Sequence, residues 1–316
     1  MAATTDFVTA QKVNRRNTLV LLAVLTALAA LVGYVIGWLL ESEASDAVPA
    51  LSKAGVAAAG LMAAVSVGWS AVSLAFGDKM VLAMANAKQI DKTDAPQLYN
   101  VVEEMAIAAG VPMPKVMVLE TDALNAFATG SKPGKGTIVV TRGLLNTLSR
   151  DELQGVVAHE MSHLANLDTR YMVVVGVTVG LIALVCDMLL RSLAWGRGNR
   201  SSSSDKKGGN AILIILLIVV AILAPIAAKF VQMAVSRQRE YLADATSVQF
   251  TRNPNGLISA LGKLAEKAEP FPGVSRATQH LFIVNPVQTF TAKSSALLAT
   301  HPDIADRIAR LRNLGA

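Results

Sequence analysis

The chain has 316 residues, of which 53% are hydrophobic and only 16% carry a charge. Soluble globular domains carry about a quarter charged residues, so this composition argues against an ordinary soluble protein and indicates a membrane protein. The net charge of +6 forms no basic stripe with interleaved aromatic residues, which favours basic ends of membrane spans over nucleic-acid binding. A single cysteine, Cys186, excludes an intramolecular disulfide.

The N-terminal part of the chain predicts a membrane hairpin over 18–76, preceded by a short polar segment at 1–17. The runs 18–40 and 54–76 contain no charged residue. Each is longer than the roughly 20 apolar residues that a helix needs to cross a bilayer. The second run is rich in alanine and glycine, which allow two helices to approach closely.

Basic and acidic residues on the two sides of the first run predict its orientation. Three basic residues precede it, and the loop after it carries three acidic residues against one lysine; they are Lys12, Arg15 and Arg16, and then Glu41, Glu43, Asp46 and Lys53. Because cytoplasmic flanks of membrane spans are enriched in lysine and arginine, we expect residues 1–17 and the segment after residue 76 to lie in the cytoplasm.

The segment 77–170 predicts a mixed α and β arrangement. An amphipathic pattern over 96–109 indicates a helix, and the valine-rich stretches 115–119 and 137–141 indicate strands. Between these strands lies the sequence Asn-Ala-Phe-Ala-Thr-Gly at 125–130, followed by a cluster of turn-forming residues. A strand edge here could bind an extended peptide through backbone hydrogen bonds, or it could belong to an ordinary hairpin.

A metal-binding motif follows at the end of the same segment. Ser149 and Glu152 have the spacing of a capping box, which gives the next helix a defined start. His159 and His163 are four residues apart, so they share one helix face and can bind a single zinc ion. Glu160 directly follows the first histidine and is placed to contact a water molecule on the metal rather than the metal itself.

A second hydrophobic hairpin is predicted over 171–235. Its two apolar runs, 171–190 and 211–231, flank a serine- and glycine-rich loop at 196–210 that we expect to be flexible. This loop is basic, which conflicts with a full crossing to the outside. The sequence leaves open whether the hairpin spans the membrane or enters it only partly, so the chain has up to four transmembrane helices.

The third zinc ligand is expected in 236–316, directly after this hairpin. Glu240 and Asp244 are four residues apart and share a helix face. We assign Glu240 to the metal and Asp244 to the free ring N–H of His159. Since both ends of a hairpin lie on one side of the membrane, the hairpin brings Glu240 to the two histidines.

These residues predict a zinc endopeptidase mechanism. Three protein ligands leave one position of a zinc ion for water, and Glu160 can take the proton of that water and pass it to the leaving amine. The oxyanion needs further donors, for which His301 and Arg307 are candidates, although His301 could equally be an ordinary residue at a helix start. The stretches 254–267 and 303–314 are predicted helices.

The order of these motifs resembles that of the HtpX-type membrane metallopeptidases of bacteria and archaea, which are distant relatives of the CAAX prenyl proteases. The resemblance covers nearly the whole chain and implies an α-helical membrane protein with a mainly α (α+β), zincin-like domain formed by 77–170 and 236–316. It implies one Zn²⁺ per chain, and it implies peptide binding along a strand formed by Asn125, Ala126, Phe127 and Ala128. It also implies a multi-pass protein of the inner (plasma) membrane whose catalytic domain faces the cytoplasm. Its expected partners are the lipid bilayer and misfolded or damaged membrane proteins, which it would degrade under stress.

Three other functions compete with this interpretation. A CAAX-type prenyl protease would share the site but surround it with more membrane spans than the four predicted here. A non-catalytic membrane chaperone or scaffold would not need Glu160 and a complete set of ligands. A transporter would need more intramembrane polar groups than the isolated Asp187.

Overall fold

The computed structural model describes residues 7–44, 51–130, 134–178, 237–267, 281–283 and 302–314. These residues fall into two compact units. One contains 17–73, and the other contains 74–177 and the C-terminal part from 231 onwards, together with the N-terminal residues up to 16. The predicted third and fourth apolar runs, including the loop 196–210, lie outside the described residues beyond position 178.

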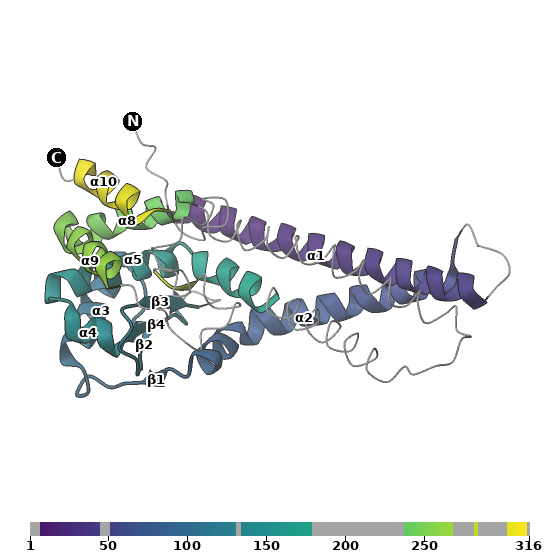
Figure 1. Ribbon diagram of the computed structural model, residues 1–316, viewed down its shortest axis with the longest axis horizontal. Coiled ribbons are helices and arrows are strands. Elements are labelled where there is room, and N and C mark those ends of the chain that lie inside the picture. The colour runs from purple at the N-terminus through teal and green to yellow at the C-terminus, as the bar shows by residue number, and fades with distance from the viewer. Residues whose placement is uncertain are drawn as a thin grey trace, which may run out of the picture. The chain divides into compact units, whose positions relative to one another are not determined.

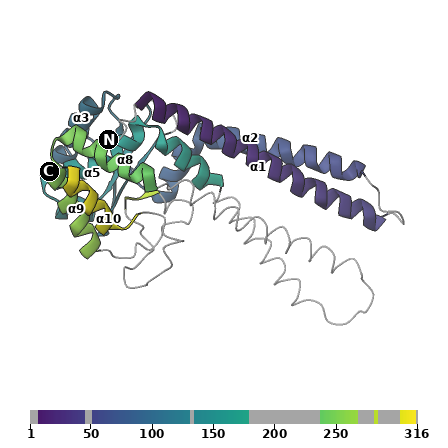
Figure 2. The same ribbon diagram turned by 90° about the horizontal axis from the view of Figure 1, so that it is seen from above.

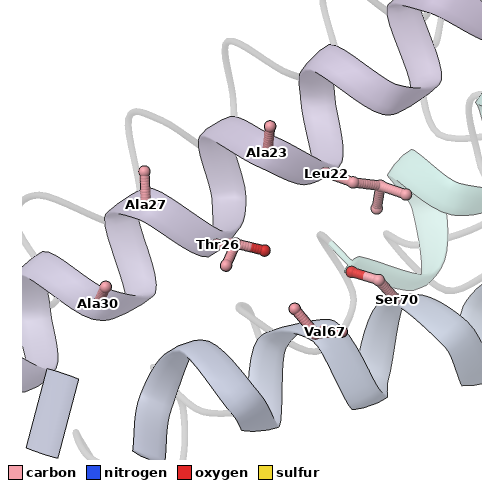
Figure 3. Close-up of a pocket in the computed structure, with 7 residues that line it drawn as sticks. All are labelled: Leu22, Ala23, Thr26, Ala27, Ala30, Val67 and Ser70. Carbon is pink, nitrogen blue, oxygen red and sulfur yellow. The ribbon is translucent and has the colours of Figure 1, made fainter. Parts of the chain in front are cut away.

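The first unit consists of the greater part of two long helices, α1 (Phe7–Ala44) and α2 (Lys53–Ala85), which run side by side (Figure 1). Gly37 lies against the backbone of Ala54, and a Cβ at Gly33 would come within 2.6 Å of the carbonyl oxygen of Ala58. Glycine at these positions allows the two backbones to approach closely. Further along, the helices leave a hollow of about 560 Å³ lined mostly by small apolar residues (Figure 3); they are Leu22, Ala23, Thr26, Ala27, Ala30, Val67 and Ser70.

Both helices are long and apolar enough to cross a membrane, over 28 residues (Gln11–Trp38) and 33 residues (Lys53–Ala85). They include the two predicted runs but extend beyond them. The helix α1 begins at Phe7, and its residues up to 16 belong to the second unit. In the added turns, Asn14 is buried while Lys12 and Arg15 are exposed.

A four-stranded sheet forms one layer of the second unit. Its strands are β1 (Lys88–Gln89), β2 (Lys115–Leu119), β3 (Ala126–Thr129) and β4 (Thr137–Thr141), in the order β1-β2-β4-β3. The central pair β2 and β4 is parallel, whereas β1 and β3 pair antiparallel with their neighbours. The predicted strands 115–119 and 137–141 are confirmed, and β3 is an edge strand of the sheet.

Helices cover this sheet and carry the rest of the core. They are α3 (Pro96–Ala109), α4 (Arg142–Thr147), α5 (Arg150–Ala165), α8 (Arg237–Thr251), α9 (Pro254–Glu266) and α10 (Ile304–Leu314). The helix α5 packs against the sheet and against α3, α8 and α9, so it is the central element of the unit. In Figure 2, α8, α9 and α10 lie together, in agreement with their contacts.

Local sequence explains several helix boundaries. The helix α3 begins with Pro96 and ends at Gly110, which has the left-handed φ of 65° typical of a helix C-cap. The helix α9 has Asn253 as its N-cap and Pro254 in its first turn. Where α5 crosses α9, a Cβ on Gly155 would lie 2.6 Å from the backbone nitrogen of Leu257, so only glycine permits this contact.

Candidate metal centre

The helix α5 supplies two of the three candidate ligands. Its capping box is present: Ser149 accepts a hydrogen bond from the backbone N–H of Glu152, and Glu152 accepts one from the backbone N–H of Ser149 at 2.7 Å. Most residues of α5 are buried, including His159, Glu160 and His163. A helix that lies inside the core holds these side chains in fixed positions and shields them from water.

His159, His163 and Glu240 converge on one point, with their ligand atoms within 4.8 Å of one another. The Nε2 atoms of the two histidines are 3.2 Å apart. Glu240 places Oε2 3.6 Å from Nε2 of His159 and Oε1 3.7 Å from Nε2 of His163. Two nitrogens bound to one tetrahedral zinc ion at about 2.05 Å lie about 3.3 Å apart, so this donor set fits zinc.

A carboxylate fixes the ring of each histidine from behind. Asp244 Oδ1 lies 3.0 Å from Nδ1 of His159, and Asp168 Oδ2 lies 3.0 Å from Nδ1 of His163. When Nδ1 donates its hydrogen to a carboxylate, Nε2 keeps its lone pair for a metal. Both lone pairs then point to the position that Glu240 also faces, and this arrangement favours a cation there.

Arg307 is fully buried beside Asp244 and Glu240. Its Nε and Nη2 donate to the two carboxylate oxygens of Asp244 at 2.9 and 2.7 Å, and Nη1 lies 3.7 Å from Glu240. Burial opposes ionisation of Asp244, but the charge and hydrogen bonds of Arg307 and the hydrogen bond with His159 outweigh it and lower the pKa of Asp244 to about 2. Burial likewise opposes the charge of Arg307, and Asp244 more than compensates and raises its pKa.

Glu160 lies between the metal-binding group and β3. Its carboxylate is buried and accepts a hydrogen bond from the backbone N–H of Ala128. Burial raises the pKa of Glu160, which makes its carboxylate a stronger base than an exposed one. Burial lowers the pKa of His159, but the hydrogen bonds of Asp244 and Glu240 outweigh it and raise the value to about 9 in the absence of a metal.

The outer edge of β3 contacts a short segment from the C-terminal part of the chain. Phe127 and Phe282 form an antiparallel bridge, and their ring centroids are 4.9 Å apart. The backbone N–H of Ile283 donates to the carbonyl oxygen of Ala126 at 3.0 Å. Residues 281–283 therefore bind to this edge in the way that an added strand does.

Comparison with protein families agrees with this geometry. The family model of peptidase family M48 matches residues 92–315, which include all three metal-binding residues and Glu160. The chain belongs to peptidase family M48. It is a metallopeptidase whose metal-binding group consists of His159, His163 and Glu240.

The relatives of this M48 peptidase include HtpX homologues along nearly its whole length. It is 42% identical over 304 residues to the "Protease HtpX homolog" of Streptococcus agalactiae serotype III (strain NEM316), with 95% of this chain and 97% of that one covered. It is 46% identical over 261 residues to the "Protease HtpX homolog" of Listeria innocua serovar 6a (strain ATCC BAA-680 / CLIP 11262), with 80% and 86% covered. The crystal structure of S. mikatae Ste24p aligns with a TM-score of 0.43 and 20% identity over 77% of this chain and 58% of that one. The two HtpX homologues confirm the expected resemblance to the HtpX type.

Other predicted site residues of the M48 peptidase have different outcomes. Asp244 lies against His159 as its spacing predicts, whereas His301 falls outside the described residues. The guanidinium of Arg307 contacts Asp244, Glu240 and the ring of His159, and its role as an oxyanion donor stays a prediction. Asn125 is buried beside Thr141, and its backbone carbonyl accepts a hydrogen bond of 3.0 Å from the backbone N–H of Thr141.

Sequence reasoning missed two parts of the M48 site. Asp168 stands five residues after His163, beyond the end of α5, so helix periodicity does not connect the two. An acid just after a histidine-bearing helix is the one signal that could have suggested it. Residues 281–283 carry no local signal, because only the fold brings them to β3.

Proposed function

We propose that this M48 metallopeptidase is a zinc-dependent endopeptidase that binds one Zn²⁺ per chain. The observation that carries this proposal is the convergence of three buried ligand groups, with Glu160 beside them on the same helix. The HtpX homologues that it resembles bear the name protease, which supports the same activity.

The proposed chemistry divides between the metal and the side chains. When bound, zinc supplies Lewis acidity, which lowers the pKa of water to about 7 and polarises the scissile carbonyl. Glu160 takes a proton from the attacking water and delivers it to the leaving amine. The N–H of Ala128 holds the Glu160 carboxylate in place, and Asp244 holds the ring of His159. Arg307 acts as a positioning residue that keeps Asp244 ionised and holds Asp244 and Glu240 in place.

The proposed peptide-binding surface is formed by residues 125–128, of which Ala126, Phe127 and Ala128 belong to the edge strand β3. The backbone of Ala126 faces this edge, and Ala128 connects it directly to Glu160. An extended substrate would pair with β3 by backbone hydrogen bonds, which suits substrates of varied sequence. The backbone N–H of Ile283 donates a hydrogen bond to the carbonyl of Ala126. We therefore expect substrate to compete with residues 281–283 for this strand edge.

We further propose that the chain acts within the inner (plasma) membrane on misfolded or damaged membrane proteins, with its catalytic domain in the cytoplasm. Support comes from two helices of spanning length and from the basic residues before the first one. The second hairpin, 171–235, would add two further apolar segments. Cleavage of unfolded proteins, independent of prenylation, is the expected specificity.

The test is zinc-dependent proteolysis by the purified full-length chain. The protein is prepared in detergent with a chelator, zinc is added to the parent and to Glu160→Gln, and digestion of casein is followed. We expect one zinc bound by each protein and cleavage by the parent alone. Absence of zinc binding by the parent would sink the metal assignment, and equal cleavage by both proteins would sink the role of Glu160. Cleavage restricted to prenylated peptides would replace the proposed specificity with that of a prenyl protease.

A further inference from the structure

The second zinc-binding histidine is connected to the first apolar helix by a chain of buried hydrogen bonds. Asp168 Oδ2 lies 3.0 Å from Nδ1 of His163. The other oxygen of Asp168 accepts a hydrogen bond of 2.6 Å from Nδ2 of Asn14 in α1. Asn14 and Asp168 are 5% and 1% exposed, so water does not compete for these contacts.

The backbone turn after α5 places Asp168 in this position. The helix ends at Ala165, and Leu167 adopts a left-handed φ of 59° before the next helix begins at Asp168. A non-glycine residue in this region costs about 1 kcal/mol, so other contacts must hold the turn. Two amides of α1 do so: Gln11 donates to the carbonyl of Ala165 at 2.7 Å, and Asn14 donates to that of Asn166 at 3.0 Å.

The two histidines are therefore supported in the same manner but from different elements. His159 is held by Asp244, which Arg307 of α10 fixes with two hydrogen bonds. His163 is held by Asp168, which Asn14 of α1 fixes. The amide of Asn14 carries no charge, so it does not offset the negative charge of Asp168 in the way that Arg307 offsets that of Asp244.

We propose that Asp168 and Asn14 are positioning residues of the metal centre, and that the start of α1 is thereby a structural part of it. Asp168 sets the tautomer and orientation of the His163 ring, and Asn14 sets the orientation of Asp168. This inference rests on the proposed zinc binding. It gives the first apolar helix a second role, because the same helix carries a segment of spanning length.

Metal affinity of the full-length chain tests this proposal without any measurement of activity. All variants carry Glu160→Gln to prevent self-digestion, and zinc affinity is measured in detergent by competition with a chelator. Loss of a carboxylate behind a zinc-binding histidine lowers metal affinity on the order of 10- to 100-fold, which is the expectation for Asp168→Ala. We expect a smaller loss for Asn14→Ala and partial recovery for Asp168→Asn, whose amide oxygen can still accept from His163.

Controls separate positioning from a general effect on the fold. Asn100→Ala and Asp151→Ala make the same changes at exposed positions of α3 and α5, and they should leave affinity unchanged. The visible spectrum of bound Co²⁺ should change in Asn14→Ala and Asp168→Ala, since it reports ligand geometry. Unchanged affinity and spectrum in both would overturn the proposal. The proposal would also be overturned if the variants lose affinity only because the metal-free protein is destabilised, which a lower melting temperature of the metal-free variant would show. Failure of the parent to bind zinc would overturn the proposed function as well.

Discussion

Arg307 shows at the scale of one residue how charge is balanced inside the metal centre. Its guanidinium is fully buried and faces Asp244, Glu240 and the ring of His159. In the absence of this cation, two buried carboxylates would face each other with less compensation. The planar fork of arginine suits the two oxygens of Asp244, and a lysine offers no such fork.

Replacement of this cation should therefore destabilise the metal-free protein strongly. We expect Arg307→Met to lower the free energy of unfolding by about 3–5 kcal/mol, because it leaves buried acids unpaired. Arg307→Lys should recover only part of this loss. Chemical unfolding in detergent with a chelator measures the effect, and Arg312→Met at an exposed position of α10 is the control. Equal stability of Arg307→Met and the control would contradict the proposed charge balance.

At the scale of elements, the start of α5 is attached to α9 through one side chain. Glu152 completes the capping box and also accepts hydrogen bonds from Ser259 and from Lys263, at 2.6 and 2.7 Å. Burial opposes ionisation of Glu152, but these hydrogen bonds outweigh it and lower its pKa from 4.5 to about 2. The helix that carries both histidines is thereby anchored at its N-terminal end.

This attachment predicts a pH dependence of stability. Because the pKa of Glu152 is lower in the folded state, its contribution is complete above pH 4.5 and is lost as the pH falls towards 2. Lys263 is partly exposed and solvent screens the pair, so we expect on the order of 2 kcal/mol. Glu152→Gln should be less stable at pH 7 and should lose less stability between pH 4.5 and 2. Parallel unfolding curves of Glu152→Gln and the parent across this range would contradict the prediction, and Glu103→Gln is the exposed control.

The strand edge of β3 gives a second prediction at this scale. Phe282 is buried against Phe127, and the backbone N–H of the next residue, Ile283, donates a hydrogen bond to the carbonyl of Ala126. Loss of the ring in Phe282→Ala should weaken this contact, so a peptide that competes for the edge should bind more tightly. We expect a lower KM for peptide cleavage with little change in kcat, measured beside Ile107→Ala at an exposed position of α3. An unchanged or higher KM would show that residues 281–283 do not compete with substrate.

For the whole molecule, the metal centre joins parts of the chain that are far apart in sequence. Two of the ligands come from α5 and the third comes from α8. Residues 179–236, which lie outside the described residues, stand between these two helices in the sequence. A metal that binds only the folded arrangement stabilises it by mass action. The metal centre should therefore contribute to the stability of this unit as well as to its chemistry.

Removal of zinc should accordingly lower the melting temperature of the full-length protein in detergent. With free zinc at about 1,000 times its dissociation constant, the expected stabilisation is about 4 kcal/mol. Thermal unfolding with chelator and with added zinc measures the difference. His163→Ala should show a much smaller response to zinc, since it lacks one of the ligands. Identical melting temperatures of the parent in both conditions would contradict a folded-state metal site.

Local sequence by itself determined many of the elements and the candidate ligands of the metal-binding group. The capping box at Ser149 and the spacing of His159 and His163 depend only on residues one or two helical turns apart. The spacing of Glu240 and Asp244 likewise placed them on one face of α8, and metal-ligand chemistry suggested their separate roles. The short, valine-rich strands also followed from their residues.

Only the tertiary structure decided which distant residues support this group. Asn14 reaches Asp168 across 154 positions of sequence, and Arg307 reaches Asp244 across 63. Likewise, Phe282 meets Phe127 although nothing near Phe282 indicates a strand partner. Helix and strand patterns arise from neighbours along the chain, whereas these contacts arise from the packing of whole elements, for which a local pattern carries no information.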